Sequence, residues 1–90
     1  MNLSAKVSIP TQVMARTVGD ETIILDLASG TYYGLDPVGA RMWQLMSEGN
    51  SLNSVCDSML GEYEVTREAL EGDIRRLTEE LQAKGLVSLA

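Results

Sequence analysis

The Asp36-Pro37 pair divides this 90-residue chain into two parts with different hydrophobic periods. Before the pair, short runs rich in β-branched and aromatic residues are separated by Gly-containing turns, the pattern of antiparallel strands. After it, apolar residues recur at intervals of three and four, as on one face of an α-helix. Asp at the N-cap followed by Pro favours the start of a helix. The sequence therefore predicts an α+β domain in which strands precede helices.

Three strands are predicted before the divide, over residues 13–18, 21–27 and 31–35. The turns between them contain Gly19-Asp20 and Ser29-Gly30. The order Gly-Asp reverses the favoured Asp-Gly and leaves the first turn type open. Such closely spaced strands predict a three-stranded antiparallel meander. Residues 7–9 alternate up to Pro10, which predicts a short leading strand or arm.

Three helices are predicted after the divide, each with a polar N-cap and a glycine at its end. The N-caps are Asp36, Ser51 and Thr66, and the glycines are Gly49, Gly61 and Gly85. The short segment 62–65 between the second and third helices fits a helix-turn-helix arrangement. We therefore expect a single domain over residues 1–90. Its fold is predicted to be winged helix-turn-helix-like, a three-stranded antiparallel sheet followed by three helices.

We also expect several particular residues to be packed in the core. Trp43 and Cys56 lie on apolar stripes and are expected in the core, and Leu86-Val87 is expected to pack back onto it. Gly72 lies inside the third helix, where glycine costs about 1 kcal/mol relative to Ala. That cost predicts close packing at Gly72 or close approach by a ligand.

The side-chain inventory limits the chemistry available to the chain. It contains no His and one Cys, so the commonest general base and the usual activator of a thiol are missing. No zinc-type Cys/His spacing and no glycine-rich phosphate-binding loop can be drawn. We expect a protein that is not an enzyme and that requires neither a metal nor a cofactor. A small enzyme using carboxylates alone is the alternative left open.

Charge and hydropathy indicate the compartment and exclude some partners. The net charge of −6 argues against nucleic acid, because phosphate backbones are bound by clustered Lys and Arg. No stretch approaches the roughly 20 apolar residues of a membrane span, and the N-terminus lacks a signal-peptide core. A single Cys cannot form an internal disulfide, which fits a reducing compartment. We therefore expect a cytoplasmic protein with neither a nucleic acid nor a membrane as partner.

The last predicted strand forms an edge of the meander and consists of Thr31, Tyr32, Tyr33, Gly34 and Leu35. An open edge beside a helix suits β-strand addition, in which a peptide extends the sheet through main-chain hydrogen bonds. An edge blunted by its shortness and by Gly34 is an equally simple interpretation. The two Tyr rings point to opposite faces, so one is expected in the core and the other is free for a partner.

Charged residues flank the apolar stripe of the third helix beside Leu77. Their spacing predicts an Asp73–Arg76 pair and a Glu80–Lys84 pair. From spacing alone, a solvated face is the simpler interpretation.

Several segments together resemble the PqqD family, also called RiPP recognition elements. They are residues 13–16, 24–27, 30–36 and 38–43, followed by a closing helix like residues 73–87. The resemblance covers about residues 7–87 and rests on the order and spacing of the segments. It implies a winged-helix-like fold and a peptide chaperone that binds the leader of a ribosomally made precursor peptide.

The resemblance also implies a binding site. In the family, the leader lies as an added strand against the third strand, in a groove closed by the third helix. Carried onto this sequence, the edge is Thr31, Tyr32, Tyr33, Gly34 and Leu35, and the facing helix surface is Asp73, Arg76, Leu77 and Glu80.

The sequence of residues 32–35 and 39–43 is most similar to that of the stand-alone lasso-peptide members. That similarity implies a leader peptidase and an ATP-dependent cyclase as partners. Presentation of a precursor to a radical SAM enzyme in pyrroloquinoline quinone synthesis is the nearest alternative. A winged-helix DNA-binding regulator is the alternative from another class, although no Lys or Arg lies between Ser51 and Leu60. Pairing of the open edge with a second copy, giving a homodimer, also remains open.

Overall fold

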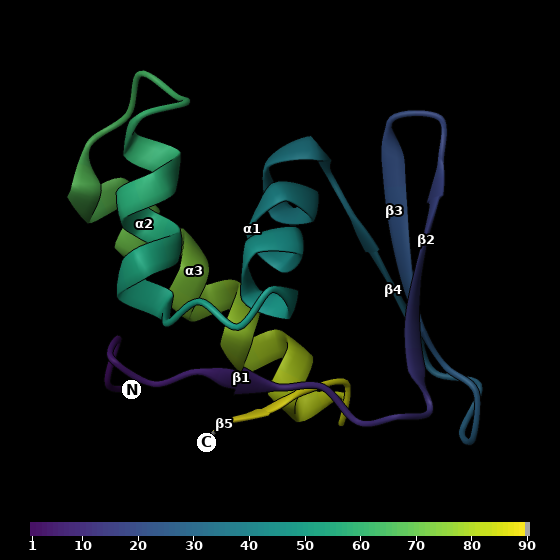
Figure 1. Cartoon of the computed structure of the whole chain (residues 1–90). Helices are drawn as coiled ribbons and strands as arrows, with labels where there is room; N and C mark the ends of the chain where they lie inside the picture. The colour runs from purple at the N-terminus through teal and green to yellow at the C-terminus, as the bar shows by residue number, and fades with distance from the viewer. Residues whose placement is uncertain (90) are drawn as a thin grey trace.

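The strands and helices follow the predicted order in the computed structural model, which describes residues 1–89 (Figure 1). At the predicted places the structure has β1 (Val7–Ser8), β2 (Val13–Val18), β3 (Glu21–Asp26), β4 (Tyr32–Leu35), α1 (Pro37–Ser47), α2 (Leu52–Leu60) and α3 (Arg67–Ala83). A short strand near the C-terminus, β5 (Ser88–Leu89), was not predicted. The α+β fold class, with a three-stranded antiparallel sheet followed by three helices, is confirmed.

The main sheet has the order β2-β3-β4, and both of its pairings are antiparallel. The hairpin between β2 and β3 turns through Gly19-Asp20, where Gly19 has a φ of 63° and Asp20 has a negative φ. A positive φ at the first position alone is the pattern of a type II′ turn, which suits the Gly-Asp order. Because β3 is central, β2 and β4 are the two edges of this sheet.

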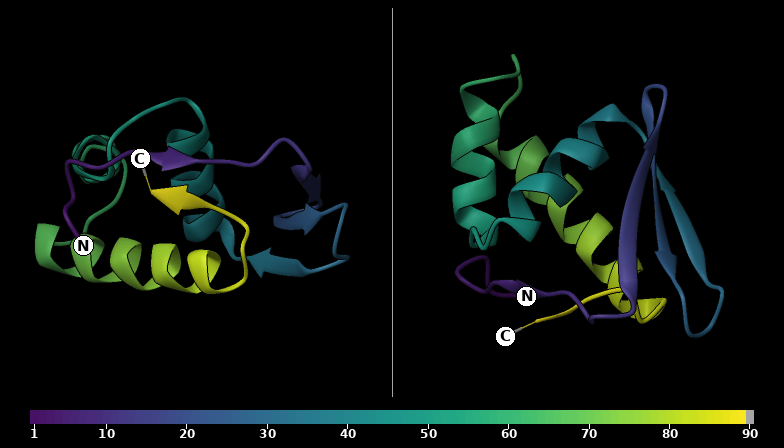
Figure 2. Two further views of the ribbon diagram at one scale, coloured as in Figure 1. Left: turned by 90° about the horizontal axis from the view of Figure 1, so that it is seen from below. Right: turned by 45° about the vertical axis from the view of Figure 1, so that its right-hand side comes forward.

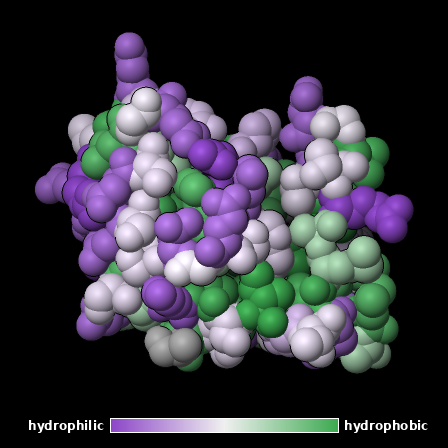
Figure 3. All heavy atoms as spheres, viewed as in Figure 1, coloured by the Kyte–Doolittle hydropathy of each residue, from purple (hydrophilic) through white to green (hydrophobic). Residues whose placement is uncertain are grey.

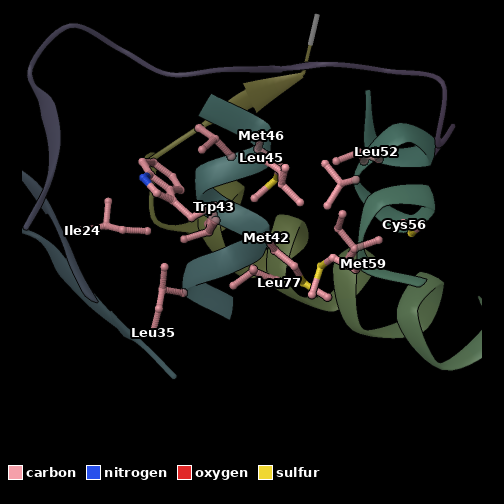
Figure 4. Packing of buried hydrophobic residues seen from close by; sticks show 14 of the residues in the cluster. Ile24, Leu35, Met42, Trp43, Leu45, Met46, Leu52, Cys56, Met59 and Leu77 are labelled. Carbon is pink, nitrogen blue, oxygen red and sulfur yellow. The ribbon is translucent and has the colours of Figure 1, made fainter. Parts of the chain in front are cut away.

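One face of the sheet packs against the helices. Ile24 of β3 and Leu35 of β4 point toward α1, where they meet Met42 and Trp43 (Figure 4). On its other flank α1 contacts α2, which in turn packs on α3. Full burial of a large aliphatic side chain contributes roughly 1.5–3 kcal/mol, so this continuous cluster is the main source of stability. Trp43 and Cys56 both belong to it, as expected.

The helices begin and end where the sequence predicts. The Asp36, Ser51 and Thr66 side chains accept hydrogen bonds from the backbone N–H groups of Gly39, Ser54 and Ala69. These bonds satisfy donors that have no partner within a first helical turn. The last turn of α3 ends in a Schellman motif, in which Gly85 has a φ of 72° and the N–H of Leu86 bonds to Leu81 O at 2.9 Å.

The chain beyond this motif packs back onto the core. Leu86 and Val87 are buried, as predicted, and β5 then pairs antiparallel with β1. The pairing of Val7 with Leu89 explains why the leading strand forms at all, because an isolated two-residue strand has no partner of its own. In the described residues 1–89, no helix is long and apolar enough to cross a membrane.

The prediction of close packing at Gly72 is wrong. A Cβ built at Gly72 would meet nothing within 4 Å, so no neighbouring segment of the chain approaches it. The position faces solvent on α3.

Candidate functional site

A groove of about 270 Å³ lies where the β4 edge meets the helices. Figure 2 shows the end of β4 close to the C-terminal turns of α3, with the chain leading from the strand directly into α1. The groove is lined by three groups of residues: Tyr33, Gly34, Leu35 and Asp36; Val38, Gly39 and Met42; and Asp73, Arg76, Leu77 and Glu80. One strand and two helices therefore form its walls.

The backbone of β4 offers unpaired groups at this edge. Asp26 N–H donates to Thr31 O at 2.8 Å, which makes Thr31 and Asp26 a hydrogen-bonded pair. Antiparallel pairs alternate between bonded and non-bonded, and Tyr32 and Gly34 lie opposite Leu25 and Ile23 at non-bonded positions. The N–H and C=O groups of Tyr32 and Gly34 consequently point away from β3, toward the open edge.

The two neighbouring tyrosines lie on opposite faces of β4. Tyr32 is 70% exposed on the face away from the helices. Tyr33 packs against the core, and its hydroxyl donates a hydrogen bond to the Glu80 carboxylate on α3. This bond raises the pKa of Tyr33 above its ordinary value, and burial adds to the shift. The expectation that one ring packs and the other is free is confirmed.

Only one of the two predicted ion pairs on α3 is formed. Arg76 Nη2 lies 3.3 Å from Asp73 Oδ1, as predicted. Both side chains are well exposed, so the pair adds little to stability. The prediction of a Glu80–Lys84 pair is wrong, since among the ion pairs of residues 1–89 none joins Glu80 to Lys84. Glu80 is bonded to Tyr33 instead, and Lys84 Nζ lies 6.0 Å from the centre of the Tyr33 ring.

The groove has an apolar floor and a charged rim. Met42 is buried, Leu77 is 8% exposed and Val38 is 37% exposed, so apolar surface is open toward the groove. Asp73, Arg76 and Glu80 stand along the α3 side. A surface of this kind can hold an extended chain through its backbone and accept an apolar side chain between charged neighbours.

The structure brings most of the sequence-predicted site residues together. Tyr33, Gly34, Leu35, Asp73, Arg76, Leu77 and Glu80 all line the groove, whereas Thr31 and Tyr32 do not. Thr31 precedes β4, and Tyr32 contributes its backbone to the open edge. Sequence reasoning missed Asp36, Val38, Gly39 and Met42. The signal was available, because the Asp36-Pro37 helix start places the first turn of α1 directly beside the end of β4.

The described residues contain no group of three or more His, Cys, Asp and Glu side chains that could hold a metal ion. Cys56 is buried, and burial raises the pKa of its thiol above the ordinary value. A buried thiol with a raised pKa is a poor nucleophile.

Comparison with known proteins identifies relatives of this chain. Residues 21–87 match the family model described as Coenzyme PQQ synthesis protein D (PqqD). A structure titled "TbiB1 in Complex with the TbiA(beta) Leader Peptide" is 37% identical, with a TM-score of 0.83 over 90% of this chain and 94% of that one. A second, "Lasso peptide synthetase B1 complexed with the leader peptide", is 27% identical, with a TM-score of 0.85 over 93% and 99%. The search of curated proteins gave no match. From the family match over most of its length and this identity to TbiB1, the chain belongs to the PqqD family.

Proposed function

We propose that this chain binds the leader segment of a ribosomally made precursor peptide by β-strand addition along β4. It then presents the precursor to the enzyme that modifies or processes it. The observation that carries this proposal is the open β4 edge beside the groove, where Tyr32 and Gly34 turn unpaired backbone groups away from β3. A peptide strand laid there gains main-chain hydrogen bonds, and its alternate side chains enter the groove beside α3.

The similar structures support this role and indicate the pathway. Both are titled as complexes with a leader peptide, and one is named a lasso peptide synthetase B1. We therefore assign the chain to lasso-peptide maturation, with a leader peptidase and a cyclase as its enzymes. It acts there in the cytoplasm as a binding protein without catalysis of its own, which fits its lack of His and its buried Cys56.

Different groove residues contact different parts of the leader. The backbone of Tyr32 and Gly34 provides affinity that does not depend on the leader sequence. Val38 and Leu77 select an apolar leader side chain. The charged groups of Asp73, Arg76 and Glu80 favour oppositely charged side chains at the neighbouring leader positions. The Tyr32 ring, which is exposed on the other face of β4, flanks the outward side chains of the added strand.

Fluorescence anisotropy of labelled leader peptides encoded beside this gene tests the proposal. Saturable binding at micromolar concentrations or below is expected, and binding by none of these leaders would contradict it. Gly34→Pro removes the outward N–H without touching a hydrogen bond to β3, and its Cβ would meet nothing within 4 Å. We expect at least about a tenfold loss of leader affinity, equivalent to about 1.4 kcal/mol. Ala15→Pro, which removes an outward N–H on the opposite edge, is the matched control.

A further inference from the structure

A second cleft lies on the other side of α1, beneath the β2–β3 hairpin. Its volume is about 540 Å³, and it is separate from the groove at β4. Ala15, Ala40, Trp43 and Tyr63 line it. Polar side chains line it as well, those of Thr17, Thr22, Arg41, Gln44 and Ser47. Figure 4 shows the Trp43 indole projecting from α1 toward the sheet. A cleft of this kind can accept uncharged side chains of modest size.

The β2 edge bordering this cleft is open along its length. Leu27 N–H donates to Gln12 O at 2.9 Å, which fixes the alternation of bonded pairs between β2 and β3. Ala15 and Thr17 then occupy non-bonded positions opposite Ile24 and Thr22, so their N–H and C=O groups point away from the sheet. Both residues are exposed, although they lie on the same face as the buried Ile24.

Natural proteins usually protect such an edge with proline, bulges, charges or short length. Strand β2 has six residues in continuous register with β3 and contains neither Pro nor Gly. Its single charged residue is Arg16, and Met14 and Val18 on the same face are exposed apolar side chains. Figure 3 shows hydrophobic residues gathered on the sheet side of the molecule, while the helical side is mostly hydrophilic. An unprotected edge beside a cleft is the arrangement of a strand acceptor.

We infer that the β2 edge and its cleft form a second strand-addition site, which binds an extended segment of the enzyme that acts on the leader-bearing precursor. Inward side chains of that segment are small and uncharged, because they enter the cleft between Ala15 and Trp43, whose walls also carry hydroxyl and amide groups. An acidic side chain on the opposite face lies near Arg16. The Arg41 guanidinium is already held by Glu62, at 2.8 and 2.6 Å, so the cleft wall carries no free charge there. The identity of the partner rests on the proposed function.

Charge disfavours a second copy of the chain as the occupant. If two copies paired antiparallel through β2, the outward-facing residues of one strand would have to lie opposite those of the other. Two registers satisfy this and pair most of the strand, one centred on Ala15 and one centred on Arg16. The first places the two copies of Arg16 diagonally on one face, and the second places them directly opposite each other. Each chain also carries a net charge of −6.

The two edges of one sheet then have separate tasks. The leader adds to β4 and the enzyme segment adds to β2, with β3 between them. Both strands can be present at once, so the sheet brings the substrate and the enzyme together without competition for one edge.

The test uses the purified enzyme whose gene neighbours that of this chain, with binding measured by biolayer interferometry and leader binding by anisotropy. Ala15→Pro removes an outward N–H that makes no bond to β3, so the sheet can stay intact. We expect it to weaken enzyme binding by at least about tenfold and to leave leader affinity within about twofold. Gly34→Pro should do the reverse. This double dissociation separates failure of the inference from failure of the proposed function.

A second variant controls for the case in which the first one misfolds. Thr17→Lys places a charge over the cleft on an exposed residue and should also weaken enzyme binding, with an unchanged circular dichroism spectrum. Wild-type enzyme affinity in both variants would overturn the inference, as would failure of the unmodified chain to bind the enzyme. A wild-type dimer in analytical ultracentrifugation that Ala15→Pro dissociates would assign the edge to self-association and overturn the choice of partner.

Discussion

The hydroxyl of Tyr33 donates a hydrogen bond to the Glu80 carboxylate and thereby joins the edge strand β4 to α3 across the groove. The two residues are far apart in sequence, and their contact links the strand directly to the helix. Tyr33 also packs against the core, so the groove wall is anchored to the interior. Core packing and this hydrogen bond therefore both connect the strand to the helix at the candidate site.

We predict that Tyr33→Phe lowers the free energy of unfolding by about 0.5–1.5 kcal/mol at neutral pH, because one hydrogen bond is lost. The bond raises the pKa of Tyr33 above 10.0, so its contribution is full below pH 10.0 and is lost as the pH rises through the raised value. Urea unfolding at several pH values measures both effects. Tyr32→Phe, on the exposed neighbour, should unfold like the wild type; equal losses from the two variants would contradict the assignment.

A second prediction concerns acid stability. Arg41 on α1 forms hydrogen bonds with Glu62 in the segment before α3, and these bonds lower the pKa of Glu62 below 4.5. This stabilisation is present above pH 4.5 and disappears as the pH falls through the lowered value. Glu62→Gln should therefore make the unfolding midpoint less sensitive to acid, as measured by urea unfolding between neutral pH and pH values below 4.5. Glu64→Gln is the control, and an acid profile shared by all three proteins would refute the role of the pair.

A third prediction places the apolar part of the site. Val38→Asp puts a carboxylate on the groove, where a bound leader would bury it without a partner. Leader affinity should fall by at least about tenfold, that is, by about 1.4 kcal/mol. Val65→Asp makes the same change at a residue that is 45% exposed and lies outside the groove. Anisotropy titrations should find its affinity unchanged, and a similar loss in both variants would remove Val38 from the site.

Tyr32 and Leu77 should contribute more to leader binding than Arg41 does. Tyr32 borders the added strand and Leu77 lines the groove, whereas Arg41 lies on the other side of α1 in the second cleft. Alanine variants of the three, compared by anisotropy, measure this order. Leu77→Ala needs a folding control, since truncating a core leucine costs about 2–5 kcal/mol. Equal effects from all three would contradict this placement of the site.

Local signals in the sequence were sufficient for most of the fold. Asp36, Ser51 and Thr66 cap helices because a side-chain oxygen next to an unpaired N–H is a local arrangement that any tertiary context preserves. The pairing of β1 with β5 was not predictable, because it joins two-residue strands at opposite ends of the chain. Alternation indicated the first of these strands but not its partner, because β5 is too short to show a period.

The candidate site was predicted to the extent that it follows from strand order. The β4 edge follows from a meander, and the facing residues of α3 came from the family resemblance. The partner of Glu80 was mispredicted because i,i+4 spacing favours Lys84, whereas the fold supplies the Tyr33 hydroxyl. The cleft beneath β2 could not be predicted, since it forms between residues of β2, β3 and α1 that only the tertiary fold brings together.

Hydrogen exchange of backbone amides, followed residue by residue by NMR with and without the leader peptide, tests the central claim most directly. Strand addition along β4 predicts that the amides of Tyr32 and Gly34 gain protection on binding. Those of Tyr33 and Leu35, already directed toward β3, should change little. Protection without this alternation, or protection confined to Ala15 and Thr17 on β2, would contradict leader binding at the β4 edge.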